Sequence, residues 1–156
     1  MLVSMHSKKS REEIAKVIRE HGYRATPQRL AIYDALHKSG SHPTAQEVHQ
    51  TVLERDPSVS LATVYKTLQL FVELGLAREM GFRDQIHYDP EVEYHVHLVC
   101  TSCGKIEDLH IDELESFISQ IEDETEFEIT GQRFDMYGLC SDCKREKRDI
   151  SPPSLA

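Results

Sequence analysis

The sequence contains 156 residues, with 18 lysines and arginines against 27 aspartates and glutamates and a formal net charge of −9 at pH 7. A chain of this length forms one or two small domains. Its longest apolar stretch, residues 68–77, is interrupted by Gln69 and Glu73 and is too short to cross a membrane. The first ten residues lack the apolar core of a secretory signal, so we expect a cytoplasmic protein with no membrane partner.

The charge is unevenly distributed along the chain. Residues 1–90 carry 12 basic and 11 acidic side chains, whereas residues 91–156 carry 6 and 16. Within the first 30 residues, 7 basic side chains face 3 acidic ones. Because nucleic acid responds to the local field, the acidic total does not exclude DNA binding. The asymmetry indicates two modules with different roles.

The first half has the element order of a winged helix-turn-helix. Gly22 is typical of a helix end, Thr26 and Pro27 of a helix start, and Thr44 with Glu47 of a capping box. Together these signals predict four helices and then a β-hairpin as the wing. The helices are expected near residues 8–21, 27–39, 44–55 and 61–74, and the strands at 76–80 and 85–88.

The fourth predicted helix would be the recognition helix of such a fold. Leu61, Val64 and Leu68 form its apolar face, and Thr63, Tyr65 and Lys66 belong to the opposite face. These three can offer a methyl group, a ring and a cation to base edges and phosphates. An ordinary solvated helix face would look the same, so the pattern alone leaves both interpretations open.

The second half predicts a small α/β module after a hinge at Asp89-Pro90-Glu91. Its expected elements are strands at residues 96–99 and 105–110, a helix at 112–122, and strands at 126–130 and 133–137. We therefore predict an α+β protein, with an N-terminal winged helix-turn-helix over 1–88 and a small α/β dimerisation domain over 89–145. Residues 146–156 are predicted to be a disordered tail. A module this small needs a metal or a partner to be stable.

The four cysteines form the strongest chemical signal. They are two CxxC pairs, Cys100 with Cys103 and Cys140 with Cys143. Two such pairs can complete a closed tetrahedral zinc site. The alternatives are four unrelated buried thiols or a redox CxxC, which would need a βαβ setting that neither pair has.

A second candidate metal site centres on His95 and His97. On a strand, residues two apart point to the same face, so both imidazoles can reach one ion. Candidate partners are Asp89, Asp108 and His42, and such a mixed set suits Fe²⁺, Mn²⁺, Zn²⁺ or Co²⁺. An HxH pair on an exposed strand, and a loop histidine before Pro43, are the plain alternatives.

Five sequence blocks together resemble the ferric uptake regulator (Fur) family of metal-responsive bacterial repressors. They are TPQRLAIYDAL, HPTAQEV, SLATVYKTLQLFVELGL, HVHLVCTSCGKIEDL and MYGLCSDC, in family order over about residues 12–145. The resemblance implies structural zinc on the four cysteines and a regulatory Fe²⁺ or Mn²⁺ site. The regulatory ligands it implies are His42, Asp89, His95, His97 and Asp108.

The same resemblance implies a homodimeric repressor that binds a palindromic double-stranded DNA operator. Tyr65 and Lys66 would enter the major groove and Arg24 would lie near the minor groove. No small-molecule substrate is implied beyond the metal and peroxide. The regulatory ion would select the closed arrangement of the two winged helices that fits both half-sites.

This chain differs from the iron-sensing members of that family in three features, and in these it resembles the peroxide-sensing branch. Iron sensors usually carry a His-His-Asp-His run, where this chain has Tyr94-His95-Val96-His97. Gly131 or Gln132 stands where a later histidine of an additional site would be, and both acidic ligands are aspartates. In that branch bound Fe²⁺ reacts with peroxide and nearby histidines are oxidised, which releases DNA; here they would be His42 and His95.

Two alternative functions remain at this point. One keeps the fold and changes the signal, giving an iron, zinc or manganese uptake regulator. The other is a metalloenzyme that uses the HxH site for hydrolysis, which would need a general base in a cleft. The sequence shows no motif for such a base, so we expect no enzymatic activity.

Overall fold

The computed structural model describes residues 8–38 and 42–150, without the side chains of 148–150. The chain divides between Val92 and Glu93 into two compact units. The predicted boundary lay four residues earlier, between 88 and 89. Among the described residues, no helix is both long enough and apolar enough to span a bilayer.

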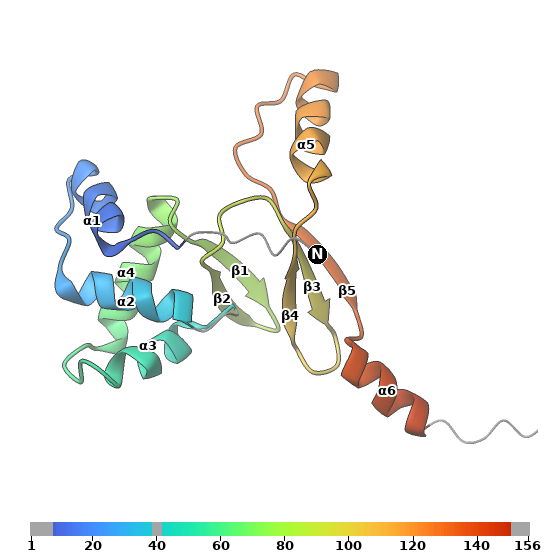
Figure 1. Ribbon diagram of the computed structural model, residues 1–156, viewed down its shortest axis with the longest axis horizontal. Helices are drawn as coiled ribbons and strands as arrows, with labels where there is room; N and C mark the ends of the chain where they lie inside the picture. Colours follow the sequence, from blue (N-terminus) through green and yellow to red (C-terminus); the bar gives the residue numbers. More distant parts are fainter. Residues whose placement is uncertain (1–7, 39–41, 151–156) are drawn as a thin grey trace, which may run out of the picture. The chain divides into compact units, whose positions relative to one another are not determined.

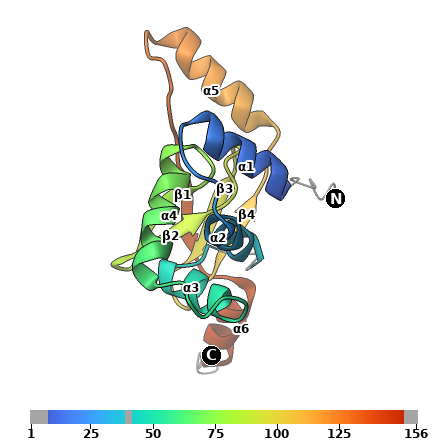
Figure 2. The same cartoon turned by 90° about the vertical axis from the view of Figure 1, so that its left-hand side faces the viewer.

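The first unit is a winged helix, as predicted (Figures 1 and 2). Four helices are followed by an antiparallel hairpin in which Arg78 pairs with Asp89 and Phe82 with Gln85. The elements are α1 (Arg11–Glu20), α2 (Pro27–Lys38), α3 (Ala45–Leu53), α4 (Leu61–Glu73), β1 (Arg78–Phe82) and β2 (Gln85–Asp89). Apolar side chains from all four helices and from β2 form a continuous core, which includes Ile14, Leu36, Val48, Leu68 and Tyr88.

Local capping signals fix the helix boundaries. The Thr44 hydroxyl accepts from the N–H of Glu47, and the Glu47 carboxylate accepts from the N–H of Thr44, which confirms the predicted capping box. Ser60 caps α4 in the predicted manner. The start of α1 was predicted too early, because Ser10 and Glu13 form a second capping box that places the first helical residue at Arg11.

The wing turns at Arg83 and Asp84, whose φ angles are 49° and 60°. Both central residues of this two-residue turn are left-handed, as in the turns whose twist matches that of the strands. The predicted turn included Gly81 and Phe82, but Gly81 instead pairs with Ile86 inside the ladder.

The second unit is a three-stranded sheet with two helices extending from opposite ends of it (Figure 1). The strand order is β4-β3-β5, with β3 antiparallel to β4 and parallel to β5. The elements are β3 (Val96–Cys100), β4 (Ile106–Leu109), α5 (Glu113–Glu124), β5 (Phe134–Gly138) and α6 (Ser141–Ile150). Its buried apolar residues are few, including Val96, Val99, Leu114 and Ile118.

Two expectations for this unit were wrong. Residues 126–130 form no strand, because the N–H of Phe127 donates to the Thr125 hydroxyl and the N–H of Ile129 to the Glu122 carboxylate. Side chains at the end of α5 thus take the backbone donors that a strand would need. Residues 146–150 were expected to be disordered, but they belong to α6; residues 151–156 lie outside the described residues.

Candidate metal centres

The four cysteine side chains lie together in the second unit. Their sulfur atoms are all within 4.8 Å of one another, and Cys103 Sγ is 3.8 Å from Cys140 Sγ. Four sulfurs about 2.3 Å from a tetrahedral zinc ion would be roughly 3.8 Å apart. Cys100 ends β3 and Cys143 lies in the first turn of α6, so the cluster joins the sheet to the last helix.

Hydrogen bonds within this cluster favour the ionised form of one of its thiols. Backbone N–H groups of Cys140 and Cys103 point at the Cys100 sulfur and lower the pKa of that thiol to about 5, favouring the thiolate that binds metal. A hydrogen bond with Ser102 lowers the pKa of Cys143, but bonds with the other thiols and desolvation outweigh it and raise this pKa to about 12. Four converging thiols cannot all ionise unless a cation neutralises them.

The first unit holds one pair of predicted metal ligands, His42 and Asp89. Nε2 of His42 lies 3.7 Å from Oδ1 of Asp89, and both side chains are almost fully buried. The loop before α3 is fastened to β2, since Nδ1 of His87 contacts the His42 carbonyl at 2.7 Å and the N–H of Tyr88 donates to Pro43. Asp89 ends β2, where its carboxylate also accepts the N–H of Glu91. A histidine and a carboxylate far apart in sequence are thus held side by side.

The second unit holds the other three predicted ligands. Nε2 of His95 and Nε2 of His97 are 2.9 Å apart, and Asp108 Oδ1 lies 3.6 Å from the first and 4.0 Å from the second. The two histidines share one face of β3, as the i, i+2 spacing predicted. Asp108 is the register partner of His97 on β4, which brings its side chain to the same face.

The tautomers of both rings follow from their second nitrogen. Nδ1 of His95 faces the carbonyl oxygen of Glu93 at 2.9 Å, and Nδ1 of His97 faces the Asp135 carboxylate at 3.1 Å. These oxygens only accept, so each Nδ1 carries the hydrogen and each Nε2 of a neutral ring carries a lone pair. Two lone pairs directed at each other beside a carboxylate form an arrangement that a shared cation stabilises.

Two residues around this cluster were not predicted from the sequence. Asp135 lies on β5 as the register partner of His97. The centroid of the His110 ring lies 5.5 Å from the centroid of the His95 ring. Burial opposes ionisation of Asp135, but hydrogen bonds from Arg133, Tyr137 and His97 outweigh it and hold its pKa below the ordinary value. The only sequence signal for Asp135 is an acidic residue on a predicted strand, which does not reveal its partner.

The predicted DNA-contacting residues are accessible on the first unit. Tyr65 and Lys66 are exposed on α4, Arg24 is exposed before α2, and Thr63 is partly covered next to the Ser60 cap. The buried side chains of α4, including Val64 and Leu68, face the core instead. The polar face of α4 is therefore presented outward as a recognition helix requires.

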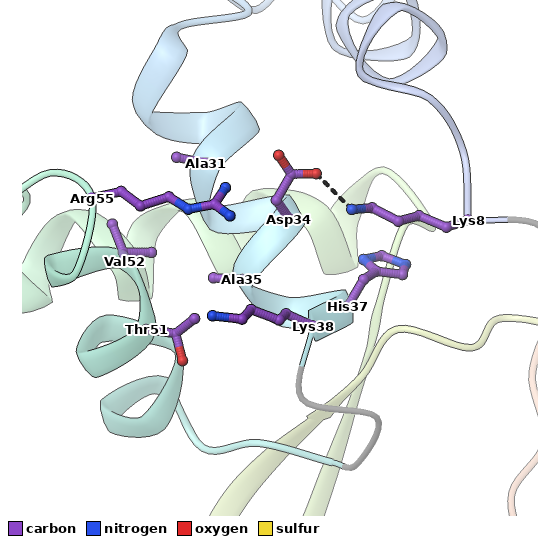
Figure 3. A pocket seen from close by; sticks show the side chains of 9 residues that line it. All are labelled: Lys8, Ala31, Asp34, Ala35, His37, Lys38, Thr51, Val52 and Arg55. Atoms are coloured by element: carbon purple, nitrogen blue, oxygen red, sulfur yellow. Dashed lines mark hydrogen bonds and ion pairs between the residues drawn. The ribbon is translucent and has the colours of Figure 1, made fainter.

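A cavity of about 270 Å³ lies beside α2 and α3, and none of the predicted ligands lines it (Figure 3). Lysines at its rim are paired within the protein, since Lys8 contacts Asp34 at 2.7 Å and Lys38 contacts Glu54 at 3.2 Å. We assign no ligand to this cavity.

The fold and these donor clusters define a winged-helix protein of the metal-binding class. The model of the ferric uptake regulator family matches residues 20–137. This chain belongs to the ferric uptake regulator family.

Known relatives include regulators of different signals. The peroxide-responsive repressor PerR of Staphylococcus epidermidis is 38% identical over 136 residues, which cover 86% of this chain and 91% of the relative. The crystal structure of the Campylobacter jejuni peroxide stress regulator is 33% identical with a TM-score of 0.69, covering 82% of this chain and 97% of that one. A zinc-bound manganese uptake regulator is 30% identical with a TM-score of 0.61, covering 85% and 99%.

Proposed function

We propose that this protein is a metal-dependent transcriptional repressor that acts as a homodimer on palindromic double-stranded DNA and responds to peroxide. The observation that carries this proposal is the approach of the Nε2 atoms of His95 and His97 to each other beside Asp108. Family membership supplies the repressor class, and the peroxide-responsive relatives supply the signal. We further propose that it works in the cytoplasm, where reduced thiols remain available to zinc.

The regulatory ion is proposed to be Fe²⁺ or Mn²⁺, held by His42, Asp89, His95, His97 and Asp108. The first unit offers one nitrogen and one carboxylate and the second offers two nitrogens and one carboxylate. Neither set alone supplies the five or six N/O donors that these ions take. A shared ion would therefore favour one arrangement of the two units over others, and its differential affinity would set DNA binding.

Structural zinc is proposed at Cys100, Cys103, Cys140 and Cys143. The spacing of the sulfurs fits a tetrahedral ion, and the small apolar core of the second unit needs a further source of stability. The zinc would fix α6 to the end of the sheet, since Cys100 and Cys103 lie at the end of β3 and Cys140 and Cys143 lie at the start of α6.

Dimerisation is proposed to use the second unit. This unit exposes several large apolar side chains, namely Leu98, Leu109, Ile111, Phe117, Phe127, Met136 and Tyr137. A monomer rarely leaves so many apolar groups in water, and a symmetric partner would cover them. Two winged helices would then be available for the two half-sites of a palindrome.

DNA contact is proposed through Thr63, Tyr65 and Lys66 on α4 and through Arg24 before α2. Their exposure on the first unit supports this role. The role proposed for the protein is regulation and not catalysis, because the histidine and aspartate donors are accounted for as ligands.

Peroxide is proposed as the signal because the chain has aspartate at both acidic ligand positions and lacks the later histidine at Gly131 or Gln132. Fe²⁺ held by the proposed ligands would supply the redox chemistry that activates peroxide. In the net reaction an imidazole loses two electrons and gains one peroxide oxygen atom, and the other oxygen atom leaves as water. His42 and His95 are the residues expected to gain oxygen. Control of metal uptake by iron, zinc or manganese is the second candidate, supported by the likeness to the manganese uptake regulator.

The deciding experiment measures DNA binding by apo, Mn²⁺-loaded and Fe²⁺-loaded protein, each with and without micromolar peroxide. We expect both metals to activate binding and peroxide to abolish it only for the Fe²⁺ form, with one added oxygen atom on His42 or His95. Retention of DNA by the Fe²⁺ form, with unmodified histidines, would overturn the peroxide role and favour uptake control. Equal DNA binding by the apo form would overturn the metal-dependent repressor.

A further inference from the structure

We propose that Asp135 is a positioning residue that sets the tautomer and ring orientation of His97 and thereby its strength as a metal ligand. The inference rests on the proposed regulatory site. It concerns a residue outside the predicted ligand set, on a strand that contributes none of those ligands.

The contact is built into the sheet. His97 and Asp135 are register partners on the parallel strands β3 and β5, so their side chains point to the same face. Nδ1 of His97 lies 3.1 Å from Oδ1 of Asp135, whose side chain is only 12% exposed. Since Asp108 is the register partner of His97 on the other side, the imidazole stands between two aspartates with different geometric relations to it.

The Asp135 carboxylate is itself held in place. The Arg133 Nε–H donates to Oδ1 at 2.9 Å, and the Tyr137 hydroxyl donates to Oδ2 at 2.9 Å. The Arg133 guanidinium also forms an ion pair with the second oxygen at 2.6 Å. The positive charge offsets the cost of a carboxylate in a mostly covered position, and the two donors fix the direction of its lone pairs.

The geometry gives Asp135 a role that differs from that of a ligand. It contacts Nδ1, whereas Nε2 faces His95 and Asp108, and the two ring nitrogens point in different directions. A hydrogen on Nδ1 leaves the lone pair on Nε2, and a carboxylate acceptor makes that lone pair more basic. Nδ1 of His95 faces the neutral Glu93 carbonyl, whereas Nδ1 of His97 faces a carboxylate, which is the stronger acceptor.

The first test needs no regulatory metal. Long-range ¹H–¹⁵N correlation spectra of the zinc-containing, otherwise metal-free protein report the tautomer of each histidine. We expect His97 to carry its hydrogen on Nδ1 in the parent protein and to lose this preference in Asp135→Ala. Asp135→Asn should retain much of it, because the amide oxygen still accepts. An unchanged His97 tautomer in Asp135→Ala would overturn the inference.

The second test measures Mn²⁺ affinity by calorimetry. Outer-shell partners of this kind change metal affinity by about 10–100-fold, so we expect a loss of that size in Asp135→Ala and a smaller one in Asp135→Asn. Asp123→Ala is the matched control, because Asp123 is an exposed aspartate on α5 of the same unit. Equal losses in Asp135→Ala and Asp135→Asn would indicate a direct ligand and contradict a positioning role.

A double-mutant cycle separates positioning from general destabilisation. In the His97→Ala background, Asp135→Ala should cost no further Mn²⁺ affinity, because the ring through which it acts is gone. A full additional loss in that background would overturn the proposal. If the tautomer result holds and the parent protein binds no Mn²⁺, the proposed function fails while the role of Asp135 in orienting His97 stands.

Discussion

Nε2 of His42 lies 3.7 Å from Oδ1 of Asp89, although the two residues are far apart in the sequence. His42 lies before the capping box of α3, and Asp89 is the last residue of the wing. The hydrogen bonds from His87 and Tyr88 to the carbonyls of His42 and Pro43 create this proximity. The proximity of the two side chains therefore depends on the hydrogen bonds that join the wing to the loop before α3.

Removing the His42 imidazole should uncouple metal from DNA binding. We expect His42→Ala to lower the Mn²⁺ affinity by at least about 10-fold, because even outer-shell partners contribute that much. DNA binding at limiting Mn²⁺, followed by fluorescence anisotropy, checks this. His21→Ala is the matched control, since His21 is exposed and its ring contacts the Val17 carbonyl within its own helix region. Metal activation that is equally weak in both variants would contradict a ligand role for His42.

Loss of zinc should unfold the second unit selectively. We expect Cys103→Ser to lower the zinc content well below one ion per chain. The NMR signals of the second unit should lose their chemical-shift dispersion and move to random-coil positions. Structural zinc contributes directly to folding in small domains, whereas the first unit has its own core.

All four cysteines lie in one cluster, so re-addition of zinc to chelator-treated parent protein serves as the control. Recovery of the spectrum with zinc is expected. A second unit that stays folded after complete zinc removal would show that the cluster is not a structural zinc site.

Lys66 should contribute affinity for any DNA sequence. Removing one phosphate contact reduces the slope of log affinity against log salt by about one, and we expect Lys66→Ala to do so on operator and non-operator DNA alike. Lys38→Ala is the control, because Lys38 is paired with Glu54 on the α2–α3 side. Titrations at several salt concentrations give the slope, and an unchanged slope for Lys66→Ala would remove this residue from the DNA contact.

Asp34 should make the first unit sensitive to acid. Burial opposes its ionisation, but hydrogen bonds and charges from Lys8 and Arg11 outweigh burial and hold the Asp34 pKa below the ordinary value. A carboxyl group with a lowered pKa stabilises the folded state above its unfolded pKa, and this contribution is lost as pH falls through the folded pKa.

The free energy of unfolding of Asp34→Asn at pH 7 should therefore be lower than that of the parent protein. The difference should be about 1 kcal/mol or less, because both cations are exposed. The difference should shrink as the pH falls below about 4, where the parent carboxylate takes up its proton. Urea unfolding of both proteins across this range checks the sign. A difference that grows in acid would contradict the assignment of these ion pairs.

Sequence by itself determined the features that depend on neighbouring residues. The capping box at Thr44, the helix end at Gly22 and the two CxxC pairs each lie within a few residues, so their geometry follows from local backbone preferences. The i, i+2 spacing of His95 and His97 likewise placed both rings on one face of β3.

Tertiary structure decided the features that depend on pairing across the chain. Asp135 meets His97 only because β5 adds to β3 in one particular register, and sequence alone does not specify the register of strands separated by a helix. The absence of the predicted strand at residues 126–130 has a nearer cause, since the Glu122 and Thr125 side chains accept hydrogen bonds from the N–H groups of Ile129 and Phe127. Local signals therefore set the elements and the ligand types, while long-range pairing decided which side chains orient the ligands.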